Sequence, residues 1–448
     1  MTKAIQEDSN FFNILAAHEL GNIGNEMYCW ATALFPICRS ITGEGVRQTL
    51  SYIKALLPDL TVHTVPSGTQ AFDWVVPNEW TIRSAYIQDP TGRRIVDMED
   101  NNLHVVSYSR PVDQYISKQE LEKHLHSIVD LPNAIPYVTS YYTVGWGFCL
   151  SDHQRRTLVD GMYRVVIDSD LKPGVLNYGE LVIPGEVKDE ILFSTYVCHP
   201  SMANNELSGP VVVSALAQWL LKQPRRRYTY RIIFLPETIG SIVYLSKNLQ
   251  HLKKNLLAGF NITCAGDERC YSYLESRNGN TVADNVAAYA LQHYVGEYRR
   301  YSYLERGSDE RQYCSPLVDL PVVSLMRSKY GTFPEYHTSL DNLSLISAKG
   351  LSGSLNLIIH CLYILENNHT YTVTTPCEPQ LGKRGLYPSL GTRGTREQVM
   401  AMMNILAYSD GSKSLLEVAK LIDVDFIKCV EIVRKLFGCG VIKKCNPM

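Results

Sequence analysis

Hydrophobic and polar positions follow three different patterns along the chain. Helical periodicity predicts helices over residues 18–35 and 44–57, and a short strand at 60–66 follows them. From about 67 to 170 the chain carries many short β-rich runs separated by turns, interrupted by one helical pattern near 118–128. This second stretch predicts a separate β-rich unit.

Strand and helix patterns alternate from about residue 177. GELVIPG and DEILFSTYVCH read as adjacent strands, and later apolar runs are separated by helical segments. The segment GPVVVSALAQWLLKQ is expected to be helical, with Ser208 as its N-cap and Pro210 in its first turn. Such alternation predicts an α/β fold, a mostly parallel sheet with helices on both faces.

After about residue 375 the chain becomes rich in proline and glycine. Three short helical patterns and a possible β-wing at GCGVIKKC follow, which is the sequence of a small winged helix-turn-helix unit. The predicted organisation is therefore a discontinuous α/β domain of residues 1–66 and 171–374, an inserted β-rich domain at 67–170, and a winged-helix domain at 375–448.

Composition narrows the class of protein. With 448 residues the chain is too long for one core, and its net charge of −2 argues against a general binder of nucleic acid or membrane surfaces. No apolar run approaches the ~20 residues of a membrane span, and the first residues hold no apolar signal core. The 12 cysteines include no C-x-x-C pair, which indicates reduced thiols rather than a cysteine zinc site. We expect a cytoplasmic protein that does not bind membranes.

Four side chains of metal-binding type follow the predicted strands of the α/β part. His199, Glu237 and Asp267 come at the ends of three strands, and His337 lies in the loop FPEYHTSLDN after a fourth. The carboxyl ends of strands in an open α/β sheet form the crevice where ligands bind. Each residue alone could be a hydrogen-bonding strand end, a helix N-terminal carboxylate or a turn residue. Together, two imidazoles and two carboxylates at one edge favour a site for Zn²⁺ or a similar ion.

Several blocks also resemble a known family. HPSMANNELSG, FLPETIGS, ITCAGDE, GSDERQY and FPEYHTSLDN resemble the ordered blocks of co-catalytic zinc aminopeptidases, and the last is similar to a block of the related glutaminyl cyclases. LFPICRSITGEGVRQTL, FDWVVPNEW and YGELVIPG look like blocks of a bacterial aminopeptidase-like family with an inserted β-rich domain and an appended winged helix. This closer resemblance covers roughly residues 27–445, and it implies a zinc aminopeptidase-like fold.

The resemblance implies a ligand set. His199 and Asp267 would hold one metal ion, while Glu237 and His337 would hold a second. The bridging position between the two ions, usually an aspartate, falls on Asn205.

An asparagine cannot bridge two cations as a carboxylate does. Its amide oxygen is neutral, so two dications at Asn205 would repel each other strongly. We therefore expect one zinc ion rather than two. The family's general base is the first of two adjacent glutamates, but here the pair reads Pro236-Glu237, and Glu206 is a spare carboxylate nearby.

The role of Glu237 stays open at this stage. If Glu237 is the general base, Glu206 or Asp267 must complete the metal shell; if it is a ligand, the base must be Glu206, Asp309 or water alone. Glu237 and Glu206 are therefore the candidate catalytic residues.

Charged and aromatic neighbours are candidates for substrate binding. Asp309, Arg311 and Tyr336 lie in blocks next to the predicted ligands, and an acidic residue there would suit a free α-amino group. Arg277 could instead clamp a carboxylate. The aromatic residues of the insert either line the mouth of the site or form the core of that unit; they are Trp74, Trp80, Tyr141, Tyr142 and Trp146.

These observations predict a metal-dependent hydrolase of an amide or peptide bond, of aminopeptidase type, acting on a small peptide or amide. An amino-sugar deacylase and a catalytically inactive metal- or ligand-binding protein are the alternatives. The long helical pattern VDFIKCVEIVRKLF of the winged helix mixes acidic and basic residues, so nucleic acid is not the expected partner. A protein contact or homo-oligomerisation through the winged helix is favoured instead.

Overall fold

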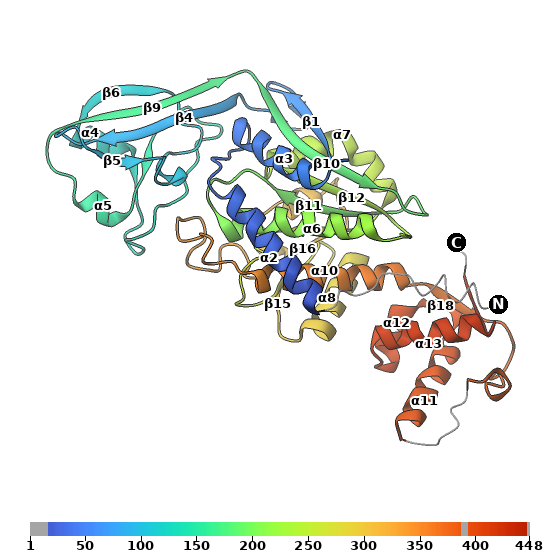
Figure 1. Cartoon of the computed structure of the whole chain (residues 1–448). Helices are drawn as coiled ribbons and strands as arrows, with labels where there is room; N and C mark the ends of the chain where they lie inside the picture. Colours follow the sequence, from blue (N-terminus) through green and yellow to red (C-terminus); the bar gives the residue numbers. More distant parts are fainter. Residues whose placement is uncertain (1–16, 387–392, 446–448) are drawn as a thin grey trace. The chain divides into compact units, whose positions relative to one another are not determined.

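A computed structural model describes residues 17–386 and 393–445 of the chain (Figure 1). The chain forms two compact units, one built from Leu15–Ile358 and another that begins at Ile359. The first contains the α/β part and the inserted β-rich segment, and the second contains the winged helix.

An eight-stranded sheet forms the centre of the first unit, in the order β1-β10-β12-β11-β13-β16-β14-β15. The four strands β12, β11, β13 and β16 are mutually parallel, and β1, β10 and β14 run antiparallel to their inner neighbours. This confirms the predicted α/β class. The strands are β1 (Thr61–Pro66), β10 (Val175–Ile183), β11 (Glu190–Tyr196), β12 (Thr229–Leu235), β13 (Leu256–Ile262), β14 (Ser272–Leu274), β15 (Arg299–Tyr301) and β16 (Val322–Met326).

One prediction about strand order is wrong. β10 and β11 are consecutive in the chain but not adjacent in the sheet, because β12 lies between them and pairs with both. Both strands are buried apolar runs, and an apolar run does not record which neighbour a strand pairs with.

Helices cover the sheet on both faces. α6 packs on β11, β12 and β13, and α2 and α3 pack against α6, while α7 contacts β10, β13 and α9. Their bounds are α2 (Ala17–Leu34), α3 (Glu44–Leu56), α6 (Ser208–Lys222), α7 (Ile239–Asn255), α8 (Val282–Ala290) and α9 (Glu310–Tyr313). The predicted helices at 18–35 and 44–57 are confirmed within one residue.

The start of α6 differs from the prediction. A π-helical turn over Ala203–Leu207 runs directly into α6, so Ser208 is already helical and is not an N-cap. The Ser208 hydroxyl donates to the Asn204 carbonyl oxygen at 2.5 Å and accepts from the Ala265 backbone N–H at 2.7 Å. Ser208 therefore ties the π turn to the segment after β13.

The inserted segment contains a four-stranded antiparallel sheet in the order β5-β4-β9-β6. Its elements are β2 (Gln70–Ala71), β3 (Trp74–Val75), β4 (Glu79–Gln88), β5 (Arg94–Asp97), β6 (Val112–Ser117), α4 (Lys118–Leu121), β7 (Leu125–His126), β8 (Phe148–Cys149), α5 (Asp152–Arg156) and β9 (Met162–Lys172). The helix expected near 118–128 is wrong beyond Leu121: a 3₁₀ turn follows, and Leu125 then pairs with Phe148.

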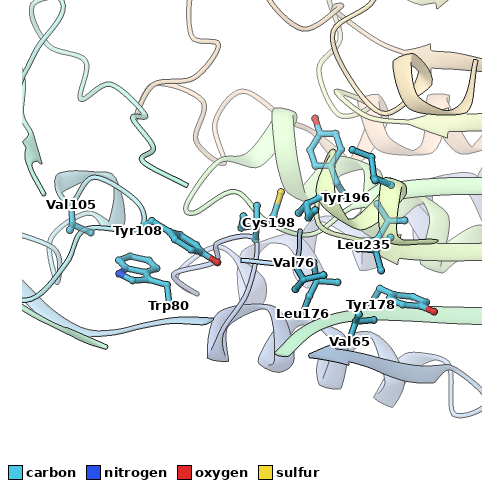
Figure 2. Packing of buried hydrophobic residues seen from close by; sticks show 14 of the residues in the cluster. Val65, Val76, Trp80, Val105, Tyr108, Leu176, Tyr178, Tyr196, Cys198 and Leu235 are labelled. Atoms are coloured by element: carbon cyan, nitrogen blue, oxygen red, sulfur yellow. The ribbon is translucent and has the colours of Figure 1, made fainter. Parts of the chain in front are cut away.

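The core of the insert is continuous with the core beneath the sheet. Figure 2 shows Trp80 and Tyr108 of the insert in the same buried cluster as Tyr178, Cys198 and Leu235 of the α/β part. The Trp80 indole N–H donates to the Ser109 carbonyl oxygen at 2.9 Å, so its polar atom is satisfied inside the cluster. A shared core of this kind fixes the insert against the α/β part.

The second unit has a three-stranded antiparallel sheet in the order β18-β17-β19, packed with three helices. Its elements are β17 (Thr370–Val373), α11 (Arg393–Ala407), β18 (Asp410–Ser414), α12 (Leu415–Ile422), α13 (Phe426–Gly438) and β19 (Ile442–Lys444). The predicted β-wing is β19, and β17 begins before the predicted boundary at 375.

The remaining helix, α10 (Ala348–Asn367), is long and apolar enough to cross a membrane by length and composition. The same properties occur in helices of a protein core, and 72% of its apolar window is buried inside the protein. It is the single such helix among the residues that the structure describes, and it gives little support for a membrane span.

Candidate functional site

A cavity of about 280 Å³ opens beyond the carboxyl ends of the parallel strands. His199 and Glu237 follow the ends of β11 at Tyr196 and β12 at Leu235 by three and two residues, and both line the cavity together with His337. The complete lining is Ile41, Trp74, Tyr137, Thr139, Tyr141, Tyr142, Cys198, His199, Glu237, Thr238, Ile239, Arg311 and His337.

His199 lies close to both Glu237 and His337. The Nε2 atom of His199 lies 3.6 Å from Oε2 of Glu237, and the imidazole rings of His199 and His337 have centroids 5.5 Å apart. Burial lowers the pKa of both histidines to about 3, so both imidazoles are neutral and keep a lone pair at neutral pH. The three side chains thus present two nitrogen donors and one carboxylate.

Glu206 supports His199 from the side opposite to Glu237. A single carboxylate oxygen of Glu206, Oε2, accepts from the His199 backbone N–H at 3.0 Å and lies 2.9 Å from His199 Nδ1. Because Nδ1 then carries the proton, Nε2 is the free lone pair. Arg39, fully buried, lies 3.5 Å from Oε1 of Glu206 and donates from Nε to the His199 carbonyl oxygen at 2.9 Å.

His337 is held by its own loop and by the insert. Its backbone carbonyl accepts from the Tyr137 N–H at 2.8 Å, and the next turn is tied by a hydrogen bond from the Ser339 N–H to the Ile135 carbonyl oxygen. The Tyr336 ring stacks on the His337 imidazole at 3.9 Å. His337 has φ +56°, a strained region for a residue with a Cβ, which these contacts maintain.

Glu237 sits between the cavity and a second buried carboxylate. Its Oε1 accepts from the Ser308 hydroxyl at 2.7 Å. Burial, and then the nearby charge of Asp309, raises the pKa of Glu237 above the ordinary value. Asp309 does not line the cavity; it accepts from the Thr238 N–H at 2.8 Å and from the Ser241 hydroxyl at 2.7 Å, at the start of α7.

Asp267 and Asn205 lie outside the cavity lining. Asp267 accepts four hydrogen bonds, two on each oxygen, from the side chain of Asn204, the N–H and hydroxyl of Ser328, and the Arg269 N–H. Asn205 donates to the Tyr196 hydroxyl at 2.8 Å, and its Oδ1 is buried without a hydrogen-bond partner in the described structure.

The other predicted residues divide between cavity and surface. Arg311 lines the cavity, whereas Arg277 pairs with Asp319 at 2.8 Å in an exposed position away from it. Trp74, Tyr141 and Tyr142 of the insert line the cavity. The remaining two aromatic residues of that set, Trp80 and Trp146, are buried in the shared core.

Three further residues of the site were not predicted from the sequence. Tyr137 forms part of the wall, Arg39 pairs with Glu206, and Asp341 accepts the backbone N–H groups of residues 203–205 and so shapes the π turn. Arg39 has one usable signal, since it is a lone charged residue in the apolar block LFPICRS.

His199 and Glu237 have the spacing of two ligands of one divalent ion. Two ligands of a tetrahedral zinc ion with bonds of ~2.0–2.1 Å lie about 3.4 Å apart, close to the separation of His199 Nε2 and Glu237 Oε2. Among the described residues, the group of possible ligands whose donor atoms all lie within 4.8 Å of one another is Cys198, His199 and Glu206. The possible ligand atoms of this group already form hydrogen bonds: Glu206 accepts from His199, and Cys198 Sγ accepts from the Glu237 N–H.

Comparison with known proteins places the chain among relatives. Over 422 residues it is 45% identical to a Clostridium acetobutylicum protein named as a candidate polysaccharide biosynthesis protein with an aminopeptidase-like domain, covering 94% of this chain and 96% of the relative. A crystal structure of a candidate peptidase from the same organism superposes with a TM-score of 0.90 at 42% identity, covering 99% of each chain.

A zinc aminopeptidase from Bacillus subtilis has a TM-score of 0.54 at 14% identity, over 76% of this chain and 94% of that one. At this identity the likeness shows the fold, which is aminopeptidase-like as the sequence blocks implied. Residues 369–444 match a winged helix-turn-helix family, and residues 28–368 match a domain of unknown function, DUF4910. The chain therefore belongs to the DUF4910 family, with an aminopeptidase-like fold followed by a winged helix-turn-helix.

Proposed function

We propose that the protein is a metal-dependent hydrolase of amide or peptide bonds that uses one zinc ion. The proposed ligands are His199 through Nε2, the imidazole of His337 and the carboxylate of Glu237. The observation that carries the proposal is the 3.6 Å separation of His199 Nε2 and Glu237 Oε2 on the wall of a cavity that His337 also lines. Two ligands of one tetrahedral zinc ion would have about this separation.

The identity of the ion rests on donor chemistry and on the fold. Two imidazoles and one carboxylate with an open position are a donor set found in catalytic zinc sites. The Bacillus subtilis protein of the same fold is named as a zinc aminopeptidase. When bound, zinc supplies Lewis-acid polarisation of a carbonyl oxygen and lowers the pKa of water to about 7.

One ion is favoured over two. A second ion would need Asp267 and a bridging carboxylate at position 205. Asp267 already has two hydrogen-bond donors on each oxygen, and Asn205 supplies a neutral amide. Exchanging those bonds for a second dication would cost the interactions that hold the loop after β13.

The chain's own residues orient the reacting groups. Glu206 holds the proton on His199 Nδ1 and so keeps Nε2 available, and the Tyr137 N–H holds the backbone at His337. Trp74, Tyr141 and Tyr142 of the insert add aromatic surface to the cavity wall. A small peptide or amide fits a cavity of about 280 Å³.

The winged helix is proposed to contact protein rather than nucleic acid. A cavity of about 530 Å³ beside α11 and α13 is lined by Glu397, Asp425 and Glu431 as well as by Lys428 and Lys435. A groove-reading helix would present a basic stripe to the phosphates, and this face mixes both signs.

Metal content and hydrolysis test the proposal together. Purified protein should contain one equivalent of zinc by elemental analysis, and the zinc-loaded protein should hydrolyse members of a panel of dipeptides, N-acyl amino acids, aminoacyl amides and N-acylated amino sugars. Cleavage confined to the last group would assign an amino-sugar deacylase. Zinc binding without any turnover would replace the enzyme with a metal-binding protein.

The one-ion assignment has its own test. Asn205→Asp supplies the missing bridging carboxylate, so we expect a second, weaker zinc equivalent in titrations of this variant. Two tightly bound equivalents in the wild type would contradict the assignment, and an unchanged stoichiometry in Asn205→Asp would show that position 205 does not face a second site.

A further inference from the structure

Arg311 is the cation of the cavity wall. It lies on α9, and its Nη2 donates to the Thr238 hydroxyl at 2.5 Å. Its Nε is buried without a hydrogen-bond partner in the described part of the chain. A buried guanidinium N–H that lacks an acceptor is costly, so a ligand that supplies one gains affinity there.

No carboxylate lies within 4.0 Å of the Arg311 guanidinium among the described residues, in contrast to Arg231, which pairs with Glu180 and Glu190. Neither nearby acidic residue forms an ion pair with it. Asp309 accepts from Thr238 and Ser241 through Oδ1, and its Oδ2 is buried without a hydrogen-bond partner in the described structure. Glu237 faces His199 and Ser308. Arg311 therefore keeps hydrogen-bonding capacity for a molecule in the cavity.

This charge pattern is the wrong one for a free α-amino group. An ammonium needs acceptor oxygens, and Glu237, the single carboxylate in the cavity lining, is the proposed metal ligand. Glu206 and Asp309 lie behind the wall, so a bound ammonium would meet the positive guanidinium of Arg311. A carboxylate, by contrast, fits the planar fork of an arginine.

The mouth of the cavity offers flat aromatic faces. Trp74 and Tyr142 both line the cavity, remain 38% and 57% exposed, and contact each other edge-on with ring centroids 5.5 Å apart. Tyr137 and Tyr141, deeper in the lining, join through their hydroxyl groups. Exposed aromatic faces of this kind bind a ring or a large apolar group rather than a small polar chain.

We propose that the substrate is an amide that carries a carboxylate near the scissile bond, bound through Arg311, with a bulky group on Trp74 and Tyr142. The inference rests on the proposed hydrolase function. In the reaction the oxygen of one water adds to the amide carbon, the C–N bond breaks, and the nitrogen takes a proton, which gives a carboxylic acid and an amine. N-acyl amino acids and N-acylated amino-sugar acids are the two sources of this chemistry.

Matched substrates test the carboxylate requirement. The zinc-loaded protein is assayed with N-acetyl-phenylalanine and its primary amide, with an N-acetylated amino-sugar acid and its methyl ester, and with phenylalanine p-nitroanilide, which has a free amine. We expect kcat/KM to be about 10²-fold or more higher for the acid than for its neutral partner in at least one pair. The pair that is cleaved identifies the source.

Variants connect that preference to one residue. Arg311→Met should lower kcat/KM for the acid by about 10²-fold, mainly through KM, and should leave the neutral analogue within about twofold. Arg311→Lys keeps the positive charge but lacks the planar guanidinium, so its kcat/KM for the acid should lie between those of wild type and Arg311→Met. Arg306 is an exposed arginine whose side chain donates to the Tyr303 carbonyl oxygen and lies over the Tyr303 ring. Arg306→Met is therefore the matched control and should change the kcat/KM of neither substrate.

Binding separates this inference from the hydrolase proposal. A hydrolysis-resistant ketone analogue of N-acetyl-phenylalanine, with CH₂ in place of the amide NH, is titrated calorimetrically into wild type and Arg311→Met. Tighter binding of the acid than of its amide, lost in the variant, supports the inference even if no substrate turns over. Preference for the free-amine substrate, or equal binding of acid and amide, overturns it while the hydrolase proposal stands.

Discussion

His199 is held in one orientation by a single carboxylate behind it. Glu206 binds the ring and the backbone of His199 at once, and Arg39 balances the charge of Glu206 in a setting where neither side chain reaches solvent. Because the buried carboxylate of Glu206 holds the proton on His199 Nδ1, the lone pair that His199 can offer to a metal ion is the one on Nε2. Glu206 does not line the cavity, so in the proposed function it is a positioning residue rather than a catalytic one.

Replacement of Glu206 should weaken metal binding without touching a ligand. In Glu206→Gln the neutral amide no longer balances Arg39, so we expect zinc affinity to fall about 10–100-fold. The free energy of unfolding should fall by about 3 kcal/mol, because a buried charge loses its partner. Competition with a zinc chelator and urea unfolding measure the two effects. Glu186→Gln, on an exposed pair with Arg225, is the control and should alter neither.

Replacement of Glu237 tests its role directly. Glu237→Gln keeps the shape and removes the charge, and as a ligand variant it should lose zinc affinity and turnover together. Zinc per chain after dialysis and kcat on the best substrate are the measurements. Retained zinc with turnover reduced about 10²–10⁴-fold would make Glu237 a general base instead. Unchanged zinc and rate would contradict the assignment of the site.

Residue-level reasoning from the sequence reached part of this arrangement. Strand ends marked His199 and Glu237 because the carboxyl ends of parallel strands meet at one edge. The same argument selected Asp267, whose oxygens are occupied by Asn204 and Ser328. The end of a strand determines roughly where the following backbone lies, but several residues separate Asp267 from the end of β13 at Ile262. The direction of its side chain, and therefore its hydrogen bonds, could not be predicted.

The π turn before α6 carries Glu206 and so determines where this carboxylate lies. Asp341 accepts the N–H groups at its start, and Ser208 joins it to the segment after β13, so the turn carrying Asn204, Asn205 and Glu206 is fixed at both ends. The sequence predicted the helix from its apolar period, but an extra residue in one helical turn leaves no mark in that period.

Two buried serines of α6 test the importance of this tie. Ser208→Ala removes a hydroxyl that both donates and accepts, so we expect the free energy of unfolding to fall by about 1–3 kcal/mol. Ser214→Ala removes an equally buried hydroxyl whose oxygen has no partner in the described structure, and it should stay within about 0.5 kcal/mol of wild type. Urea unfolding followed by circular dichroism compares them; equal losses would contradict the role given to Ser208.

At the scale of the whole molecule, the division into two units predicts that one survives without the other. The unit of Leu15–Ile358 contains the central sheet, the insert and the complete cavity. Removal of residues 376–448 should therefore leave zinc binding unchanged and the melting temperature within a few degrees of the full chain.

The exact cut matters for this experiment. β17 pairs with β18 and β19, so a chain ending at Asn368 avoids a strand without partners and is the better comparison. Thermal unfolding and zinc titration of both truncated chains give the answer. Loss of the cavity's zinc affinity, or insolubility of both chains, would show that the winged helix is integral to the first unit.

Fold class, the inserted unit and the winged helix could be expected from alternating periodicity and from the sequence blocks. The order of strands in the sheet could not, since β10 and β11 are equally apolar and differ only in which edge of β12 they pair with. The contribution of the insert to the cavity could not be predicted either, because nothing in the sequence distinguishes an aromatic residue of the wall from one of the core. Trp74 lines the cavity, whereas Trp80 is buried in the core.

The contact between the insert and the His337 loop has a consequence for when the cavity forms during synthesis. Ile135 and Ser339 are 204 residues apart in the chain, yet their hydrogen bonds join the insert to the loop of His337. Contacts between such distant residues form slowly, because a long stretch of chain must first be ordered. During synthesis the insert emerges well before residue 339, so the cavity closes only after the last strand of the sheet has been made, and a chain stalled before that point lacks a complete cavity.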